Sequence, residues 1–200
     1  MIKAVFVDLG GVLVLNKASE VYKEFEEKYG LTGDAIKDIF SFLHSGIRSV
    51  EDLQNHLSDK NISLEIWREF TSKFYNSEKR NDALVDILQS VKNKNVKIIY
   101  TSNNSSSLYK VLEKYSLSEL PDHIVNSSLI NVTKPDREFW EAAYIEAEKL
   151  IPNIQKSEIL VIDDSKTNCD SAIDFGLKSI QYNESVNNRV IAATDIGQIE

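Results

Sequence analysis

The strongest constraint on the fold is the alternation of short apolar runs with helical segments from about residue 80 onward. Strands that alternate with helices pair side by side in one direction, because each helix returns the chain across the sheet. Residues 2–7 form a further apolar run without helical spacing. The predicted strands are residues 2–7, 96–100, 123–125, 159–162 and 178–181. We therefore expect an α/β fold with a doubly wound parallel sheet.

Residues 19–76 carry helical spacing without any strand-like run, so they predict a helical block between the first strand and the rest of the sheet. Ser49 and Asp52 match a capping box, and Ser63 is placed to cap the following helix. Four short helices in succession indicate a small helical subdomain inserted after the first strand.

Polar residues follow the predicted strands and precede one helix. Because the carboxyl ends of parallel strands share one edge of a sheet, we expect these groups to surround a single cleft. The groups are Asp8, the segment Thr101-Ser102-Asn103-Asn104, the segment Thr133-Lys134-Pro135-Asp136, and the segment Asp163-Asp164-Ser165.

This set of side chains predicts phosphoryl chemistry with a divalent cation. Three neighbouring carboxylates repel one another, and hard oxygen ligands favour Mg²⁺, which accepts phosphate oxygens as further ligands. A lysine and a serine hydroxyl next to that cation suit a phosphoryl group. An aspartate there can act as the nucleophile and pass through an aspartyl-phosphate.

In this order, the motifs resemble those of the haloacid dehalogenase (HAD) superfamily. They are Asp8-x-Gly-Gly-Val-Leu, Thr-Ser102-Asn, Lys134-Pro-Asp and Asp163-Asp164, and the resemblance covers nearly the whole core, about residues 1–14 and 80–182. The resemblance implies a Rossmann-like core of residues 1–14 and 80–200. It also implies an α-helical cap of residues 15–79, because the longest interval between motifs lies between Asp8 and Ser102. In the superfamily, such a cap closes over the site and selects the substrate.

The resemblance also implies roles for individual residues. Asp8 is expected to be the nucleophile and a metal ligand, and Gly10 to offer its backbone carbonyl to the metal. Ser102 and Asn103 are expected to bind the phosphoryl group. Lys134 is expected to tether nucleophile and phosphate. Of the acid pair, Asp164 is the favoured ligand for Mg²⁺, and Asp163 is either a second ligand or a residue that supports the ligands.

The chain departs from the usual superfamily pattern at Gly10, where phosphatases generally carry a second aspartate for proton transfer. Three interpretations remain. The first is a phosphatase of small phosphate monoesters, such as sugar phosphates, that uses a cap acid (His44 being one candidate), water or a good leaving group. The second is a slow phosphatase or phosphotransferase with a persistent aspartyl-phosphate. The third is an inactive protein that binds a metabolite or another protein. A dehalogenase is disfavoured, because those members resemble an Asp-x-Tyr pattern.

Charge and composition exclude other classes. The net charge of -8 and the absence of a basic run argue against nucleic acid as a partner. The resemblance implies a small phosphorylated metabolite as the partner. The single cysteine predicts a reducing compartment. We expect no signal peptide and no membrane span, and hence a cytoplasmic protein.

Overall fold

The computed structural model describes residues 1–16, 18–183 and 187–195, and its centre is a parallel sheet of five strands. The strands pair in the order β5-β4-β1-β6-β7, with β1 between β4 and β6. The predicted α/β fold with a parallel sheet is therefore confirmed. The strands are β1 (Ala4–Val7), β4 (Lys97–Ser102), β5 (His123–Asn126), β6 (Ile159–Asp163) and β7 (Lys178–Gln181).

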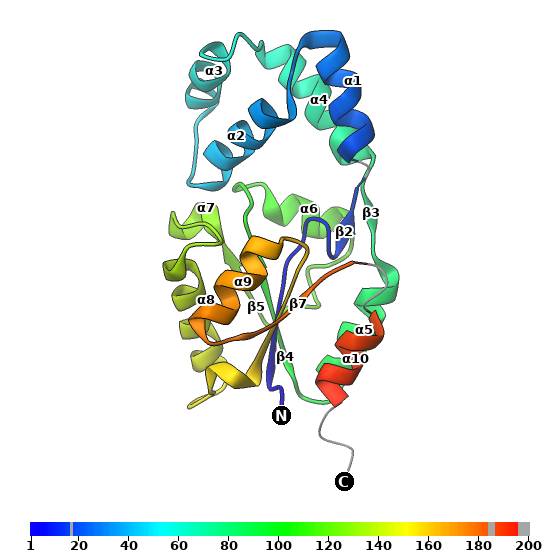
Figure 1. Cartoon of the computed structure of the whole chain (residues 1–200), viewed down its shortest axis with the longest axis vertical. Coiled ribbons are helices and arrows are strands. Elements are labelled where there is room, and N and C mark those ends of the chain that lie inside the picture. Colours follow the sequence, from blue (N-terminus) through cyan, green and yellow to red (C-terminus); the bar gives the residue numbers. More distant parts are fainter. Residues whose placement is uncertain (17, 184–186, 196–200) are drawn as a thin grey trace.

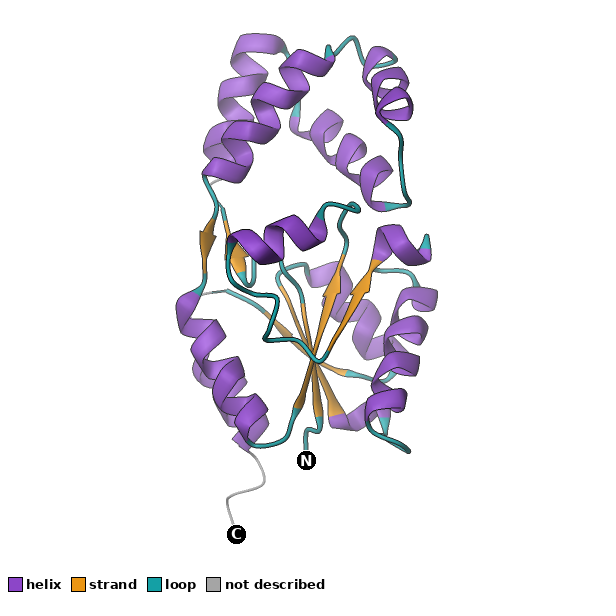
Figure 2. Cartoon of the chain, turned by 180° about the vertical axis from the view of Figure 1, so that it is seen from behind, coloured by secondary structure: helices purple, strands orange, loops and turns teal. Residues whose placement is uncertain are grey.

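Helices cover both faces of this sheet, and the alternation of side chains along each strand explains why (Figures 1 and 2). Val5 and Val7 point into one apolar core, with α5, α6 and α10, whereas Ala4 and Phe6 point into the other, with α8 and α9. The helices of this part are α5 (Asp82–Asn93), α6 (Leu108–Lys114), α7 (Ser127–Ile130), α8 (Arg137–Leu150), α9 (Lys166–Phe175) and α10 (Asn187–Asp195), with a 3₁₀ turn, η1 (Lys156–Glu158).

Four further helices form a separate layer beyond the carboxyl end of the sheet (Figure 1). They enclose an apolar core of their own, in which Phe25, Ile36, Ile39 and Phe70 are fully buried. The helices are α1 (Ala18–Tyr29), α2 (Gly33–His44), α3 (Val50–Ser58) and α4 (Leu64–Asn76). Among the residues that the structure describes, no helix is long and apolar enough to cross a membrane.

The helical layer is joined to the sheet layer by a short antiparallel ribbon. Its strands are β2 (Val14–Leu15) and β3 (Lys79–Arg80), so the chain leaves the sheet layer and returns to it side by side. The ribbon was not predicted, because strands of two residues carry no detectable periodicity. The predicted caps are present: Ser49 and Asp52 form a capping box on α3, and Ser63 caps α4.

Candidate functional site

Three strand ends meet at the edge of the sheet that faces the helical layer. Val7 of β1 is paired with Tyr100 of β4 on one side and with Ile162 of β6 on the other. The residues that follow these positions, Asp8 after β1 and Ser102 and Asp163 at the ends of their strands, therefore lie at one edge. The sequence-predicted groups are brought together there.

Lys134 lies at the centre of this group and is almost completely buried. Its ammonium donates to Asp8 Oδ1 at 2.9 Å and to Asp163 Oδ2 at 2.6 Å. It also donates to the backbone carbonyl of Thr101 at 2.8 Å. A lysine has three N–H donors, so the protein itself uses all of them. Lys134 thus holds the Asp8 carboxylate in place and supplies positive charge at the edge of the sheet that faces the helical layer.

Asp163 differs from its neighbour Asp164 in how its oxygens are used. While Oδ2 accepts from Lys134, Oδ1 accepts from the backbone N–H of Ser165 at 3.0 Å and from the Asn168 amide at 2.9 Å. Both oxygens of Asp163 are therefore held by protein donors. Asp164 is the exposed member of the pair. This geometry favours Asp164 as a cation ligand and Asp163 as the residue that orients Lys134.

Asp8, Asp163 and Asp164 form a carboxylate cluster whose oxygens lie within 4.8 Å of one another. Burial raises the pKa of Asp8 to about 7, against the opposing effect of Lys134. Burial, and then the charge of Asp163, raise the pKa of Asp164. Carboxylates crowded in this way favour a bound cation, and an all-oxygen donor set fits Mg²⁺. The residues present therefore fit the predicted metal.

The turn after Asp8 brings two glycines to the cluster, with different constraints. Gly11 has a φ of +76°, and a Cβ there would lie 2.4 Å from Asp164 Oδ2. Position 11 therefore requires glycine. Gly10 lines a cavity between the sheet layer and the helical layer, and a Cβ at this position would meet no heavy atom within 4 Å. Position 10 thus lacks an acid although a Cβ there would meet no steric obstacle.

Asn103 fixes the backbone that carries Lys134. Its amide donates to the Lys134 carbonyl and accepts from the Lys134 N–H, both at 2.8 Å. This clamp uses the side chain that the sequence assigned to phosphate. The Ser102 side chain is buried at the end of β4 and lines the same cavity.

A cavity of about 270 Å³ lies above the cluster and is lined by both layers. From the sheet layer come residues of the strand ends, and from the helical layer come mostly aromatic side chains. Sequence reasoning assigned no function to several of the latter, because aromatic residues at helical spacing are indistinguishable from core. The lining residues that the sequence did not single out as functional are Asn16, Tyr22, Phe40, Phe74, Tyr75 and Glu78.

His44, the candidate acid of the helical layer, also lines this cavity. Burial, and then the charge of Lys134, lower its pKa to about 4. Its imidazole is therefore neutral at neutral pH and has no acidic imidazolium proton to donate. On the loop and helix that follow Asp164, Asn168 contacts Asp163, whereas Asp170 pairs with Lys166 at 2.5 Å on the surface.

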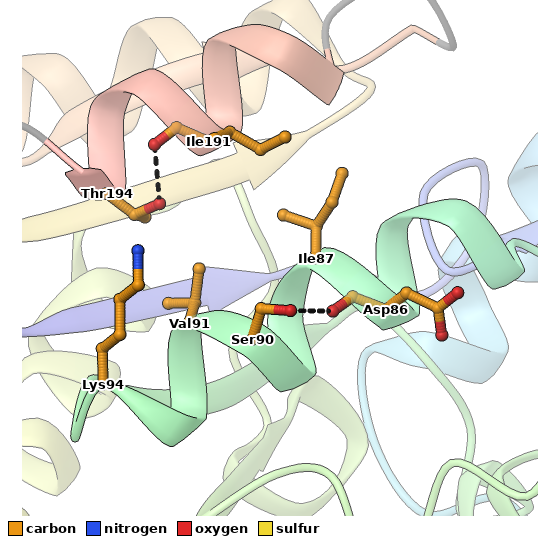
Figure 3. Close-up of a pocket in the computed structure, with 7 residues that line it drawn as sticks. All are labelled: Asp86, Ile87, Ser90, Val91, Lys94, Ile191 and Thr194. Carbon is orange, nitrogen blue, oxygen red and sulfur yellow. Dashed lines mark hydrogen bonds between the residues drawn. The ribbon is translucent and has the colours of Figure 1, made fainter.

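A second cavity, of about 330 Å³, lies between α5 and α10 (Figure 3). The hydroxyls of Ser90 and Thr194 in its wall donate to carbonyls of their own helices. It contains none of the strand-end groups, so the chemistry described above is confined to the cavity between the layers.

Comparison with known proteins places this site in a family. A family model for haloacid dehalogenase-like hydrolases matches residues 2–176. No curated protein matches the chain. Among solved structures, a predicted HAD-like family hydrolase from Porphyromonas gingivalis is similar over 100% of both chains, with 19% identity and a TM-score of 0.76.

Two other solved structures share the fold. A HAD family enzyme from Bacteroides thetaiotaomicron, in complex with magnesium and inorganic phosphate, is 20% identical, with a TM-score of 0.68 over 92% of this chain and 95% of that one. A putative beta-phosphoglucomutase from Thermotoga maritima is 20% identical, with a TM-score of 0.63 over 98% of this chain and 99% of that one. Because the family model spans most of the sequence, the chain belongs to the haloacid dehalogenase-like hydrolases.

Proposed function

We propose that the protein is a Mg²⁺-dependent phosphatase of small phosphate monoesters and that Asp8 is its nucleophile. The observation that carries this proposal is the buried contact of Lys134 with Asp8 and Asp163 beneath the cavity between the layers. The complex of the Bacteroides enzyme with magnesium and phosphate supports the same class of reaction. The resemblance of the motifs favours sugar phosphates or similar metabolites as substrates.

In this proposal, Asp8 attacks phosphorus through the carboxylate oxygen that Lys134 does not hold. One oxygen, Oδ1, accepts from Lys134, which fixes the plane of the carboxylate. The Ser102 hydroxyl and the Asn103 region line the cavity where the phosphoryl oxygens would lie. Lys134 contributes its charge and holds Asp8, since its three donors are already used.

The metal would be held by Asp8, by Asp164 and by the carbonyl of Gly10, with Asp163 as a supporting residue. When bound, Mg²⁺ would offset the charge of the carboxylates and of the phosphoryl group. The lowered carboxylate repulsion would keep Asp8 ionised and therefore nucleophilic.

Residues 15–79 would act as a cap that encloses the substrate and selects it. Two contacts between the layers support this role. The Ser127 hydroxyl donates to the His44 carbonyl at 2.7 Å, and the Lys114 ammonium donates to the Tyr75 carbonyl at 2.7 Å. The cap would thus be held over the site at both sides.

The alternative is a slow or inactive member that binds a metabolite or a protein, and the observation that favours it is the absence of an acid at Gly10. A panel of phosphate esters with Mg²⁺ distinguishes the two. The wild type should release phosphate in a Mg²⁺-dependent way, and the isosteric Asp8→Asn variant, checked for folding by circular dichroism, should not. Equal rates for the two proteins would contradict the enzyme. Beryllofluoride should form an adduct with the wild type and none with Asp8→Asn.

A further inference from the structure

The cap wall of the cavity between the layers is a connected set of aromatic rings. The ring of Phe74 lies 6.3 Å from Tyr22 and 5.5 Å from Phe40, and Phe40 lies 5.6 Å from the imidazole of His44. Tyr75 follows Phe74 in α4 and lines the same cavity. These rings come from α1, α2 and α4, so three separate helices place aromatic side chains above the strand-end acids.

The same cavity is poor in groups that could protonate a departing oxygen. Position 10 is a glycine, the His44 imidazole is neutral, and the Lys134 donors are all used. Glu78 lies on the α6 side of the cavity, where its carboxylate accepts from the Tyr115 hydroxyl at 3.1 Å and burial raises its pKa, so it is a carboxyl that could supply a proton on that side. On the strand-end side, where position 10 carries no acid, the site suits a leaving group that departs without a proton.

We propose that the preferred substrate is a small aryl phosphate, whose aromatic ring contacts the wall of Tyr22, Phe40 and Phe74. This inference rests on the proposed phosphatase function. A phenol ionises near a pKa of about 10, as tyrosine does. An alkoxide is far more basic, with a basicity close to that of hydroxide. An aryl oxygen therefore departs without the missing acid, and its ring matches the wall.

The reaction balances without an additional reactant. Asp8 forms a bond to phosphorus, and the bond from phosphorus to the aryl oxygen breaks, leaving the electron pair on the aryloxide. A water oxygen then bonds to phosphorus and displaces the Asp8 carboxylate, which leaves inorganic phosphate. One proton of that water passes to solvent, and the aryloxide takes a proton from solvent.

Four esters separate the ring from the leaving group: phenyl phosphate, acetyl phosphate, cyclohexyl phosphate and glucose 6-phosphate. Acetyl phosphate has a good leaving group and no ring, whereas cyclohexyl phosphate has a ring-sized group and leaves poorly. With Mg²⁺, kcat/KM for phenyl phosphate should exceed that for the two alkyl esters by about 10²–10⁴-fold, the usual contribution of an acid–base group. Comparable values for glucose 6-phosphate or cyclohexyl phosphate would overturn the inference.

The Phe74→Leu variant tests the wall, because leucine keeps an apolar side chain there. Its kcat/KM for phenyl phosphate should fall about tenfold, while that for acetyl phosphate should change less than about twofold. An equal loss for both esters would overturn the inference.

Binding tests the wall without turnover. With Mg²⁺, phenylphosphonate should raise the melting temperature of the wild type more than methylphosphonate does, and equal shifts would overturn the inference. If the protein hydrolysed the alkyl esters as efficiently as phenyl phosphate, the inference of an aryl substrate would fail and the proposed phosphatase would stand. A rate no higher than that of Asp8→Asn on all four esters would overturn the proposed phosphatase itself.

Discussion

Gly11→Ala tests whether the turn after Asp8 is shaped by the carboxylate cluster. Gly11 has a φ of +76°, and its added methyl would lie 2.4 Å from Asp164 Oδ2. No carbon and oxygen atoms pack at that distance, so the Asp164 side chain or the turn has to move. Gly10→Ala is the matched control, because a methyl there meets no heavy atom within 4 Å and its φ is not in the left-handed region.

The expected loss of folding stability follows from the backbone, and the expected loss of Mg²⁺ affinity follows from the carboxylate cluster. An L-residue in the left-handed region costs about 1–2 kcal/mol. For a chain of this size, that corresponds to a fall in melting temperature of about 2–8 °C. Displacement of Asp164 would additionally weaken Mg²⁺ binding, by about 10- to 100-fold if the effect is like that of other disturbed metal sites. Gly10→Ala should be neutral or stabilise by up to about 1 kcal/mol, through the unfolded chain.

The assay is thermal unfolding with and without Mg²⁺, followed by phosphate release from an aryl phosphate. Wild type and Gly10→Ala should both gain stability from Mg²⁺, by about 2.7 kcal/mol when the free ion is at 100 times its dissociation constant. Gly11→Ala should melt earlier and gain much less. If Gly11→Ala kept the wild-type melting temperature and Mg²⁺ response, the described geometry of the turn would be wrong.

Three further predictions concern the charged cluster. Lys134→Met should lower the free energy of unfolding by about 3–5 kcal/mol, because the carboxylates of Asp8 and Asp163 lose their shared cation. The loss should be larger at pH 8 than at pH 5, and urea unfolding at both pH values measures it. In the metal-free wild type, the pKa of Asp8 is about 7, so the folded state holds a proton that the unfolded state releases near pH 4. The free energy of unfolding should therefore fall as pH rises from about 4 to 7. An Asp8→Asn variant with the same pH dependence would count against this. Finally, Asp164→Asn should weaken Mg²⁺ binding measured by calorimetry more than Asp163→Asn does, because protein donors already hold both oxygens of Asp163; the reverse order would exchange their roles.

The fold was predictable where one physical signal dominates each segment. Apolar runs gave the strands, because a strand buried on both faces has few polar positions. The capping box of Ser49 and Asp52 gave the start of α3, because it is a local interaction. The β2–β3 ribbon and α7 were not predictable, since strands of two residues and a helix of four cover only about one period, which is too short to show a repeat. Their formation depends on contacts between distant parts of the chain.

The location of the candidate site was also predictable, because topology alone brings parallel strand ends to one edge. The partners of its groups were not. Whether the Asn103 amide would bind phosphate or clamp the Lys134 backbone depends on a loop more than 30 residues away, and the sequence favoured phosphate. The aromatic wall was hidden for another reason. Phe74 packs against the core of the helical layer and also lines the cavity, so its spacing identifies only the core position.

The two glycines after Asp8 show which part of this site the fold dictates and which part the chemistry dictates. At position 11, a side chain would collide with Asp164, so packing alone explains the glycine. At position 10, a Cβ would meet no heavy atom within 4 Å, so packing does not explain the glycine. Gly10→Asp therefore tests the chemistry: it should raise kcat/KM for glucose 6-phosphate, whose alkoxide leaving group needs an acid, and leave kcat/KM for phenyl phosphate nearly unchanged. A leaving group that departs as an aryloxide needs no carboxyl at this position for the step in which the ester bond breaks.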